Sequence, residues 1–107
     1  MKIFELLKQI KICTYQFLYH RPYGTKDIID IKRIIVSKEF LKSYPSPIKI
    51  RKYYDFYNDH KYFDKPIVVR KLSNSSNGRV ILVDGYIRFG LAHLMKLKCV
   101  PVKWVKD

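Results

Sequence analysis

The sequence ILVDGYIRFGLAHLMKLKCVPVKWV, residues 81–105, decides the fold of this chain. An apolar, β-branched run over residues 79–83 favours a strand, and Asp84-Gly85 breaks that run. From residue 86 onward the apolar residues recur with a helical period, which predicts a helix with one apolar face formed by Ile87, Leu91, Leu94 and Met95. Residues 100–105 predict a second strand. The stretch therefore predicts a compact unit of strand, turn, helix and returning strand.

The turn between the predicted strand and helix is a candidate anion site. The first amides of a helix have no partner within the helix, and the helix dipole favours negative charge there. Arg88 lies in this first turn and adds a positive charge. Asp84 has two interpretations. Its carboxylate caps the helix, which the sequence favours, or it faces a pocket and holds a metal ion or a ribose hydroxyl.

Short motifs in this chain resemble those of the ParB N-terminal domain and sulfiredoxin superfamily. In that superfamily a strand ends in a Gly-x-x-Arg turn, a helix follows, and a strand with Val-Pro-Val closes the unit. A Pro-x-Lys helix start and a Pro-Ile-x-Val strand come earlier in the chain. The corresponding sequences here are, in order, Pro47-Ile48-Lys49-Ile50, Pro66-Ile67-Val68-Val69-Arg70, Gly85-Tyr86-Ile87-Arg88 and Val100-Pro101-Val102.

The resemblance covers residues 28–105 and implies an α/β domain, with a small mixed sheet of about four strands and helices packed against it. At 107 residues the chain is expected to form a single domain. Residues 1–25 lie before the family core as an N-terminal helical extension. Residues 2–19 carry an amphipathic helical pattern, although residues 14–19 alone also suit a strand.

The resemblance also shows what chemistry is missing. Sulfiredoxin reduces an over-oxidised cysteine with a Cys in a Gly-Gly-Cys-His-Arg turn, and Tyr86 and Ile87 stand here in place of the Cys and His. Without that thiol there is no nucleophile, so sulfiredoxin activity is not expected. In ParB proteins the turn is Gly-Glu-Arg-Arg, and its acid and first arginine are also replaced here. We therefore assign no catalytic residue, and nucleotide hydrolysis or kinase activity is left open.

What remains is a candidate site for a nucleotide or phosphate. In sulfiredoxin the lysine matched by Lys49 contacts nucleotide phosphate. The resemblance therefore implies a site formed by Lys49, Gly85, Tyr86 and Arg88, with Asp84 beside them, for ATP or CTP with Mg²⁺. No dedicated metal site is expected, since His20, His60 and His93 are scattered without metal-ligand spacing. The cysteines, Cys13 and Cys99, lie among apolar residues and are expected to be buried thiols.

The charge of the chain points to a polyanionic partner. There are 22 Lys and Arg against 9 Asp and Glu, a formal net charge of +13. Ser46-Pro47 predicts a helix start, and Lys49, Arg51 and Lys52 crowd its first turns, where the dipole disfavours cations. We take these residues and Arg88 as candidates for non-specific contacts with nucleic-acid phosphates. No helix-turn-helix pattern follows residue 105, so reading of bases is not expected.

Two function hypotheses follow from these observations. The first is a nucleotide-binding, ParB-like domain of a DNA-associated protein of plasmid or phage type. The alternative is a small basic interaction or inhibitor protein that binds an acidic protein partner without nucleotide, or forms a homodimer through its N-terminal helix. No apolar run is long enough to cross a membrane, and the N-terminus does not resemble a signal peptide. A cytoplasmic location is expected.

The remaining segments complete the predicted fold. Residues 28–36 are rich in β-branched residues and predict the first strand. Residues 37–44 predict a short turn or one helical turn, with Phe40 and Leu41 facing the core. The helix from Ser46-Pro47 is expected to run to about Tyr62, and the resemblance implies a strand over residues 66–72. Residues 73–78 form a polar turn that predicts a hairpin with the strand after it.

Overall fold

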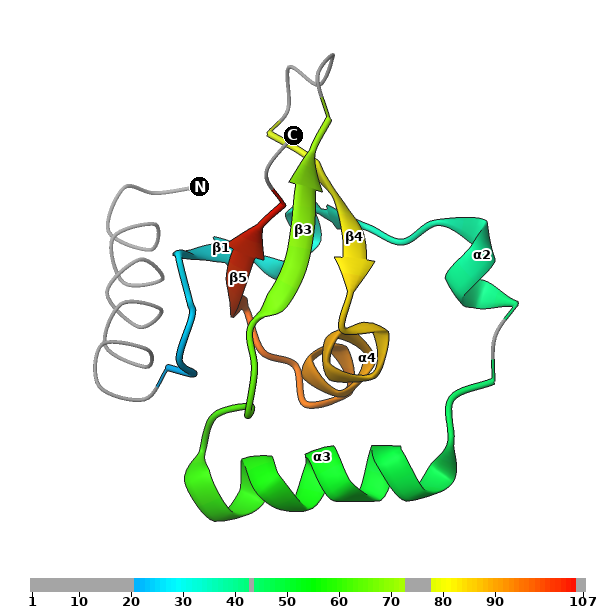
Figure 1. Cartoon of the computed structure of the whole chain (residues 1–107), viewed down its shortest axis with the longest axis vertical. Coiled ribbons are helices and arrows are strands. Elements are labelled where there is room, and N and C mark those ends of the chain that lie inside the picture. The colour runs from blue at the N-terminus through cyan, green and yellow to red at the C-terminus, as the bar shows by residue number, and fades with distance from the viewer. Residues whose placement is uncertain (1–20, 43, 73–77, 106–107) are drawn as a thin grey trace.

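The computed structural model describes residues 21–42, 44–72 and 78–105 (Figure 1). The predicted helix over residues 2–19, Cys13 and the tip of the predicted hairpin lie outside the described residues. In chain order the elements are β1 (Asp27–Asp30), a 3-10 turn (Ile31–Arg33), β2 (Ile34–Ile35), α2 (Lys38–Leu41), α3 (Pro47–His60), β3 (Ile67–Lys71), β4 (Val80–Asp84), α4 (Tyr86–Leu94) and β5 (Cys99–Trp104).

The strands form one mixed sheet of five strands in the order β1-β5-β3-β4-β2. The pair β3–β4 is the predicted hairpin and is antiparallel, as is β1–β5. The pairs β3–β5 and β2–β4 are parallel. The chain leaves β4, forms α4 and returns as β5 beside β3, which is the strand–turn–helix–strand unit expected from residues 81–105. The α/β class with a small mixed sheet is thus confirmed.

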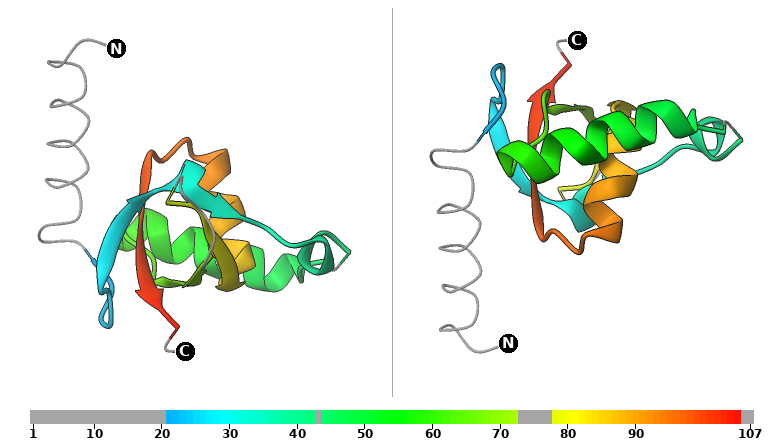
Figure 2. Two further views of the ribbon diagram at one scale, coloured as in Figure 1. Left: turned by 90° about the horizontal axis from the view of Figure 1, so that it is seen from above. Right: turned by 90° about the horizontal axis from the view of Figure 1, so that it is seen from below.

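The prediction of one continuous strand over residues 28–36 is wrong. A 3-10 turn interrupts it, because the Asp30 carboxylate accepts a hydrogen bond from the Lys32 amide at 2.8 Å and caps the turn. The two halves then join opposite edges of the sheet, β1 beside β5 and β2 beside β4. Only three residues connect these edges, so the sheet must curl to bring them close (Figure 2). This break raises the strand count from about four to five.

Two helices pack beside the sheet in successive layers. Helix α4 contacts β3, and α3 packs on the outside of α4 (Figure 1). Helix α4 buries Phe89, Leu91 and Ala92 in the core. Helix α3 is fully described and buries none of its residues completely, although Ile50, Tyr53 and Tyr57 pack against the core from its inner face. It is therefore an outer layer whose start can line a site.

Three expectations about individual side chains are corrected. Leu94 was expected on the apolar face of its helix but is 80% exposed, because the last turn of α4 extends past the core. Leu41 was expected to face inward with Phe40 but is 65% exposed, while Phe40 packs on the core. Cys99 is buried in β5 and is disulfide-bonded, so the prediction of a thiol at this position is wrong.

Over residues 21–42, 44–72 and 78–105 no helix combines the length and the apolar character needed to span a bilayer.

The glycine between β4 and α4 gives a first prediction. Gly85 has φ 96°, a left-handed conformation that L side chains disfavour. We expect Gly85→Ala to lower the free energy of unfolding by about 1–2 kcal/mol. Gly90, in the helical interior of α4, is the matched control, because a Cβ there meets nothing within 4 Å. Gly90→Ala should instead raise stability by about 0.5–1 kcal/mol. Urea unfolding measures both, and equal effects would contradict the assignment of strain to Gly85.

Candidate functional site

The starts of α3 and α4 lie around one cavity of about 440 Å³, called here the polar cavity. Its lining comes from four places in the chain: α2, the α2–α3 connection, the first two turns of α3, and the turn into α4. The lining residues are Phe40, Tyr44, Pro45, Ser46, Lys49, Tyr53, Asp84, Gly85, Tyr86, Ile87 and Arg88. Two helix N-termini thus contribute to the same hollow.

The turn into α4 exposes backbone amides to this cavity. The first hydrogen bond of the helix runs from the Phe89 amide to the Gly85 carbonyl at 2.9 Å. The amides of residues 86–88 precede that bond and point out of the helix end. The cap residue is Gly85 and not Asp84, which corrects the favoured interpretation of that aspartate. Asp84 is the last residue of β4, and its carboxylate accepts a hydrogen bond from the Gly85 amide at 2.8 Å.

The start of α3 has a similar character. Ser46 is the cap residue and Pro47 occupies the first turn, as predicted, and the first helical bond runs from the Ile50 amide to the Ser46 carbonyl at 3.0 Å. Neither this helix nor α4 begins with a side-chain cap hydrogen bond within the described part of the chain. Lys49 lies in this first turn, is exposed, and lines the polar cavity. An anion in the cavity would therefore meet two positive helix ends and one ammonium group.

Arg88 occupies the floor of the site in a tight ion pair. Its Nε donates to Asp64 Oδ1 at 2.9 Å and its Nη2 donates to Asp64 Oδ2 at 3.1 Å, a bidentate arrangement. The guanidinium carbon lies 4.2 Å from the ring centroid of Tyr53, close enough for a cation–π contact. The Arg88 side chain is only 10% exposed and that of Asp64 27%. The pair is therefore largely shielded from water.

The titration of the pair follows from this geometry. Burial works to raise the pKa of Asp64, but the hydrogen bond and the charge of Arg88 outweigh it and hold this pKa below its usual range. Burial works to lower the pKa of Arg88, but the hydrogen bond and charge of Asp64 outweigh it, with Tyr53 adding to the rise. Both partners therefore stay charged at neutral pH.

The structure brings together the five positions that the sequence proposed for a nucleotide or phosphate, since Lys49, Asp84, Gly85, Tyr86 and Arg88 all line the polar cavity. It does not bring Arg51 and Lys52 there. Both are exposed on α3, and Arg51 pairs with Asp55 one turn along the helix at 3.3 Å.

Several residues of the site were missed by sequence reasoning. Tyr86 stacks on Phe40 of α2 with ring centroids 5.5 Å apart, so α2 forms one wall. Asp64 precedes β3 and is separated from Arg88 by 24 positions, and no local pattern in the sequence links the two. The one available signal was general: an arginine in the first turn of an otherwise apolar helix needs an acidic partner when buried.

Comparison with known proteins places this geometry in a known fold. No family model matches the chain, and no curated protein matches it. Solved structures do match. A free serine kinase in complex with AMP has a TM-score of 0.59 at 15% identity and covers 80% of this chain. Sulfiredoxin from Arabidopsis thaliana has a TM-score of 0.58 at 17% identity, over 77% of this chain and 88% of its own length.

The C-terminally truncated partitioning protein ParB from Caulobacter crescentus matches in two complexes. With the centromeric parS site the TM-score is 0.56 at 17% identity, and with CTP-γ-S it is 0.55 at 19% identity. Each match covers 76% of this chain. The chain spans 36% of the length of the kinase and 39% of that of the parS-bound ParB. At these identities the likeness establishes the fold, and this chain has a ParB/sulfiredoxin-like fold.

The Arg88–Asp64 pair gives the prediction of this subsection. Asp64→Asn leaves a shielded guanidinium without its counter-charge and should lower the free energy of unfolding by about 3 kcal/mol at neutral pH. The control is Asp55→Asn, which breaks an exposed pair whose side chains are 80% and 54% exposed. That change should stay within about 0.5 kcal/mol.

The same pair predicts a pH dependence. Because the pKa of Asp64 is lowered in the folded state, its contribution is complete above the unfolded-state value of about 3.9 and is lost as pH falls through the folded value. The stability difference between the wild type and Asp64→Asn should therefore shrink below about pH 4. Urea unfolding from neutral to acidic pH measures it. A difference that stays constant over this range would contradict the charged pair.

Proposed function

We propose that this domain binds a nucleotide through its phosphates in the polar cavity. The observation that carries the proposal is the meeting of two helix N-termini and Lys49 at one hollow of ligand size. Phosphate oxygens are the acceptors that such amides and an ammonium group bind best. The similar folds of a serine kinase in complex with AMP and of ParB with CTP-γ-S support the proposal.

Three groups of the lining have defined roles in this proposal. Lys49 contacts a phosphate oxygen as a mobile positive charge, and the amides of residues 86–88 bind the same group from the other side. Arg88 is held in place by Asp64 through two of its N–H groups. A guanidinium has five such donors, so the ion pair fixes its orientation without using all of them. Arg88 is thereby a rigid floor for the phosphate.

Asp84 is suited to bind a cation that accompanies the phosphates. Its carboxylate is exposed at the polar cavity and by itself repels an anion. Mg²⁺ is bound in proteins by one or two carboxylates together with phosphate oxygens and water, and Asp84 offers such an oxygen donor. Among the described residues no group of three or more His, Cys, Asp and Glu forms a metal site. Mg²⁺ would therefore bind with the nucleotide and not before it.

Titration calorimetry with ATP, CTP and GTP in the presence of Mg²⁺ tests this proposal. Lys49→Gln should weaken binding by about tenfold or more, because it removes a charge-assisted hydrogen bond. Lys52→Gln is the matched control, since Lys52 is an exposed cation on the same helix that does not line the cavity. Its effect should stay within about twofold. No binding of any of the three at millimolar concentration would reject the proposal.

The charge of the chain favours a second role beside the first, in a DNA-associated protein of plasmid or phage type. A formal net charge of +13 attracts any polyanion, and Lys49, Arg51 and Lys52 are all exposed along the first turns of α3. We propose weak, sequence-independent contact of this surface with DNA phosphates. The similar fold of ParB in complex with parS supports a DNA context for this type of domain.

Fluorescence anisotropy with two unrelated duplexes across a salt series tests the DNA role. We expect affinity on the order of micromolar at low salt, equal for both duplexes, with a steep loss between about 50 and 200 mM salt. Lys52→Gln should lower the salt slope by about one, although it leaves nucleotide binding intact. A preference for one duplex would contradict phosphate-only contact. Absence of binding at low salt would favour an acidic protein as the partner of the basic surface.

A further inference from the structure

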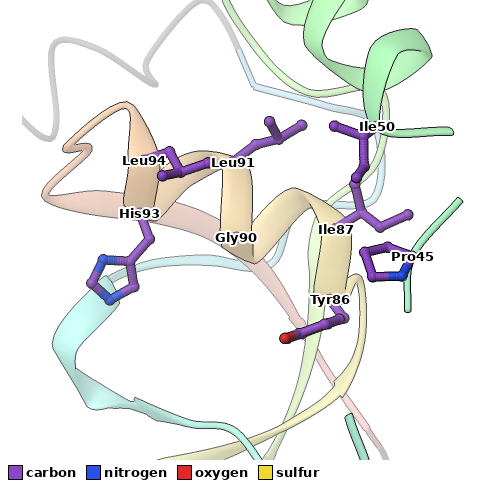
Figure 3. A pocket seen from close by; sticks show the side chains of 8 residues that line it. All are labelled: Pro45, Ile50, Tyr86, Ile87, Gly90, Leu91, His93 and Leu94. Atoms are coloured by element: carbon purple, nitrogen blue, oxygen red, sulfur yellow. The ribbon is translucent and has the colours of Figure 1, made fainter. Parts of the chain in front are cut away.

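A second cavity, called here the apolar cavity, lies beside the polar one along α4. Its volume is about 420 Å³, and its lining is almost entirely apolar (Figure 3). The lining residues are Pro45, Ile50, Tyr86, Ile87, Gly90, Leu91, His93 and Leu94. In the close view, Ile50 of α3 points toward Ile87 and Leu91 of α4, and Pro45 closes the side next to Ile87. The hollow therefore lies between the two helices that line the polar cavity.

The two cavities are neighbours with a common wall. Pro45, Tyr86 and Ile87 line both of them. The Tyr86 ring is held against Phe40, so it is a fixed partition and not a freely moving side chain. A ligand anchored by its phosphate in the polar cavity can thus extend past Tyr86 into an apolar space of a size usual for small-molecule sites.

Gly90 is an independent indication that this space has a use. It lies in the interior of α4, where glycine is the least favourable residue after proline. Its backbone is not in the left-handed region, and a Cβ at this position would meet nothing within 4 Å. Neither backbone geometry nor close packing therefore requires glycine here. What the missing side chain does provide is an open floor for the apolar cavity, and local rules are most often broken at functional sites.

We infer that the apolar cavity receives the base of the nucleotide whose phosphates occupy the polar cavity. This inference rests on the proposed function and adds how the base is recognised. A flat nucleobase in this cavity would contact mainly apolar side chains. The polar side chains of the lining are Tyr86 and the exposed His93. The bound base is stabilised by burial of its surface and not by hydrogen bonds to its edge. Binding strength should follow base size, with ATP and GTP similar and both tighter than CTP.

The experiment compares ATP with inorganic tripolyphosphate, both with Mg²⁺, by calorimetry on the full 107-residue chain. Wild-type protein should bind ATP at least about tenfold more tightly than tripolyphosphate, because only ATP fills the apolar cavity. Gly90→Leu places a side chain into that cavity and should remove this difference, with tripolyphosphate binding unchanged. Lys49→Gln should weaken both ligands. Leucine favours helix, so Gly90→Leu should keep the fold, which circular dichroism and a melting curve check.

Gly90→Ala provides the graded control, since one methyl group fills little of the cavity and should reduce ATP affinity less than leucine does. Equal ATP affinity in wild type and Gly90→Leu, with the dependence on Lys49 intact, would overturn the inference and leave the proposed function standing. Failure of both ATP and tripolyphosphate to bind wild-type protein would overturn the two together. A change of oligomeric state in Gly90→Leu with ATP binding unaltered would likewise overturn it and assign the apolar cavity to a protein contact.

Discussion

The ion pair between Arg88 and Asp64 is the contact on which the site depends. It joins the first turn of α4 to the segment that leads from α3 into β3, and Tyr53 of α3 covers the guanidinium at 4.2 Å. Three parts of the chain are thereby fixed around one buried charge. The distance between the starts of α3 and α4 follows from this arrangement, and with it the shape of the polar cavity. A shielded pair is sensitive to the loss of either partner, so the geometry of the site and the stability of the fold are linked.

The electrostatics of the polar cavity differ from those expected of a simple basic patch. The charge of Arg88 is offset by Asp64, and the lining also contains one carboxylate, Asp84, and one ammonium group, Lys49. The charged side chains around the cavity therefore nearly balance, although the whole chain carries +13. What favours an anion is the pair of helix ends, whose outward amides are fixed by the backbone and need no rearrangement on binding. This balance is consistent with the proposed binding of phosphate together with a cation, whereas the surplus positive charge of the chain lies outside the cavity.

The fold family offers the same scaffold for several activities. The similar structures include a serine kinase, a partitioning protein bound to DNA or to a nucleotide analogue, and a sulfiredoxin. The turn into α4 carries Gly85 and Arg88 in a Gly-x-x-Arg pattern and holds no cysteine. A fold of this kind does not by itself fix a function, since function resides in the residues placed upon it. In this chain Tyr86 and Ile87 line both cavities and form the wall between them.

The sequence by itself determined the local elements. Apolar, β-branched runs, the Asp84-Gly85 break and the Ser46-Pro47 start predicted β4, α3, α4 and β5, because periodicity and turn chemistry are properties of neighbouring residues. The resemblance supplied β3. The resemblance also named the five positions that meet at the polar cavity. Only the tertiary structure decided which face each side chain takes and what it meets. It split the predicted first strand between two sheet edges, left Leu94 in solvent, and paired Arg88 with an aspartate 24 positions away. These outcomes depend on how the curled sheet and the two helices share one small core, and no local pattern records that competition for buried space.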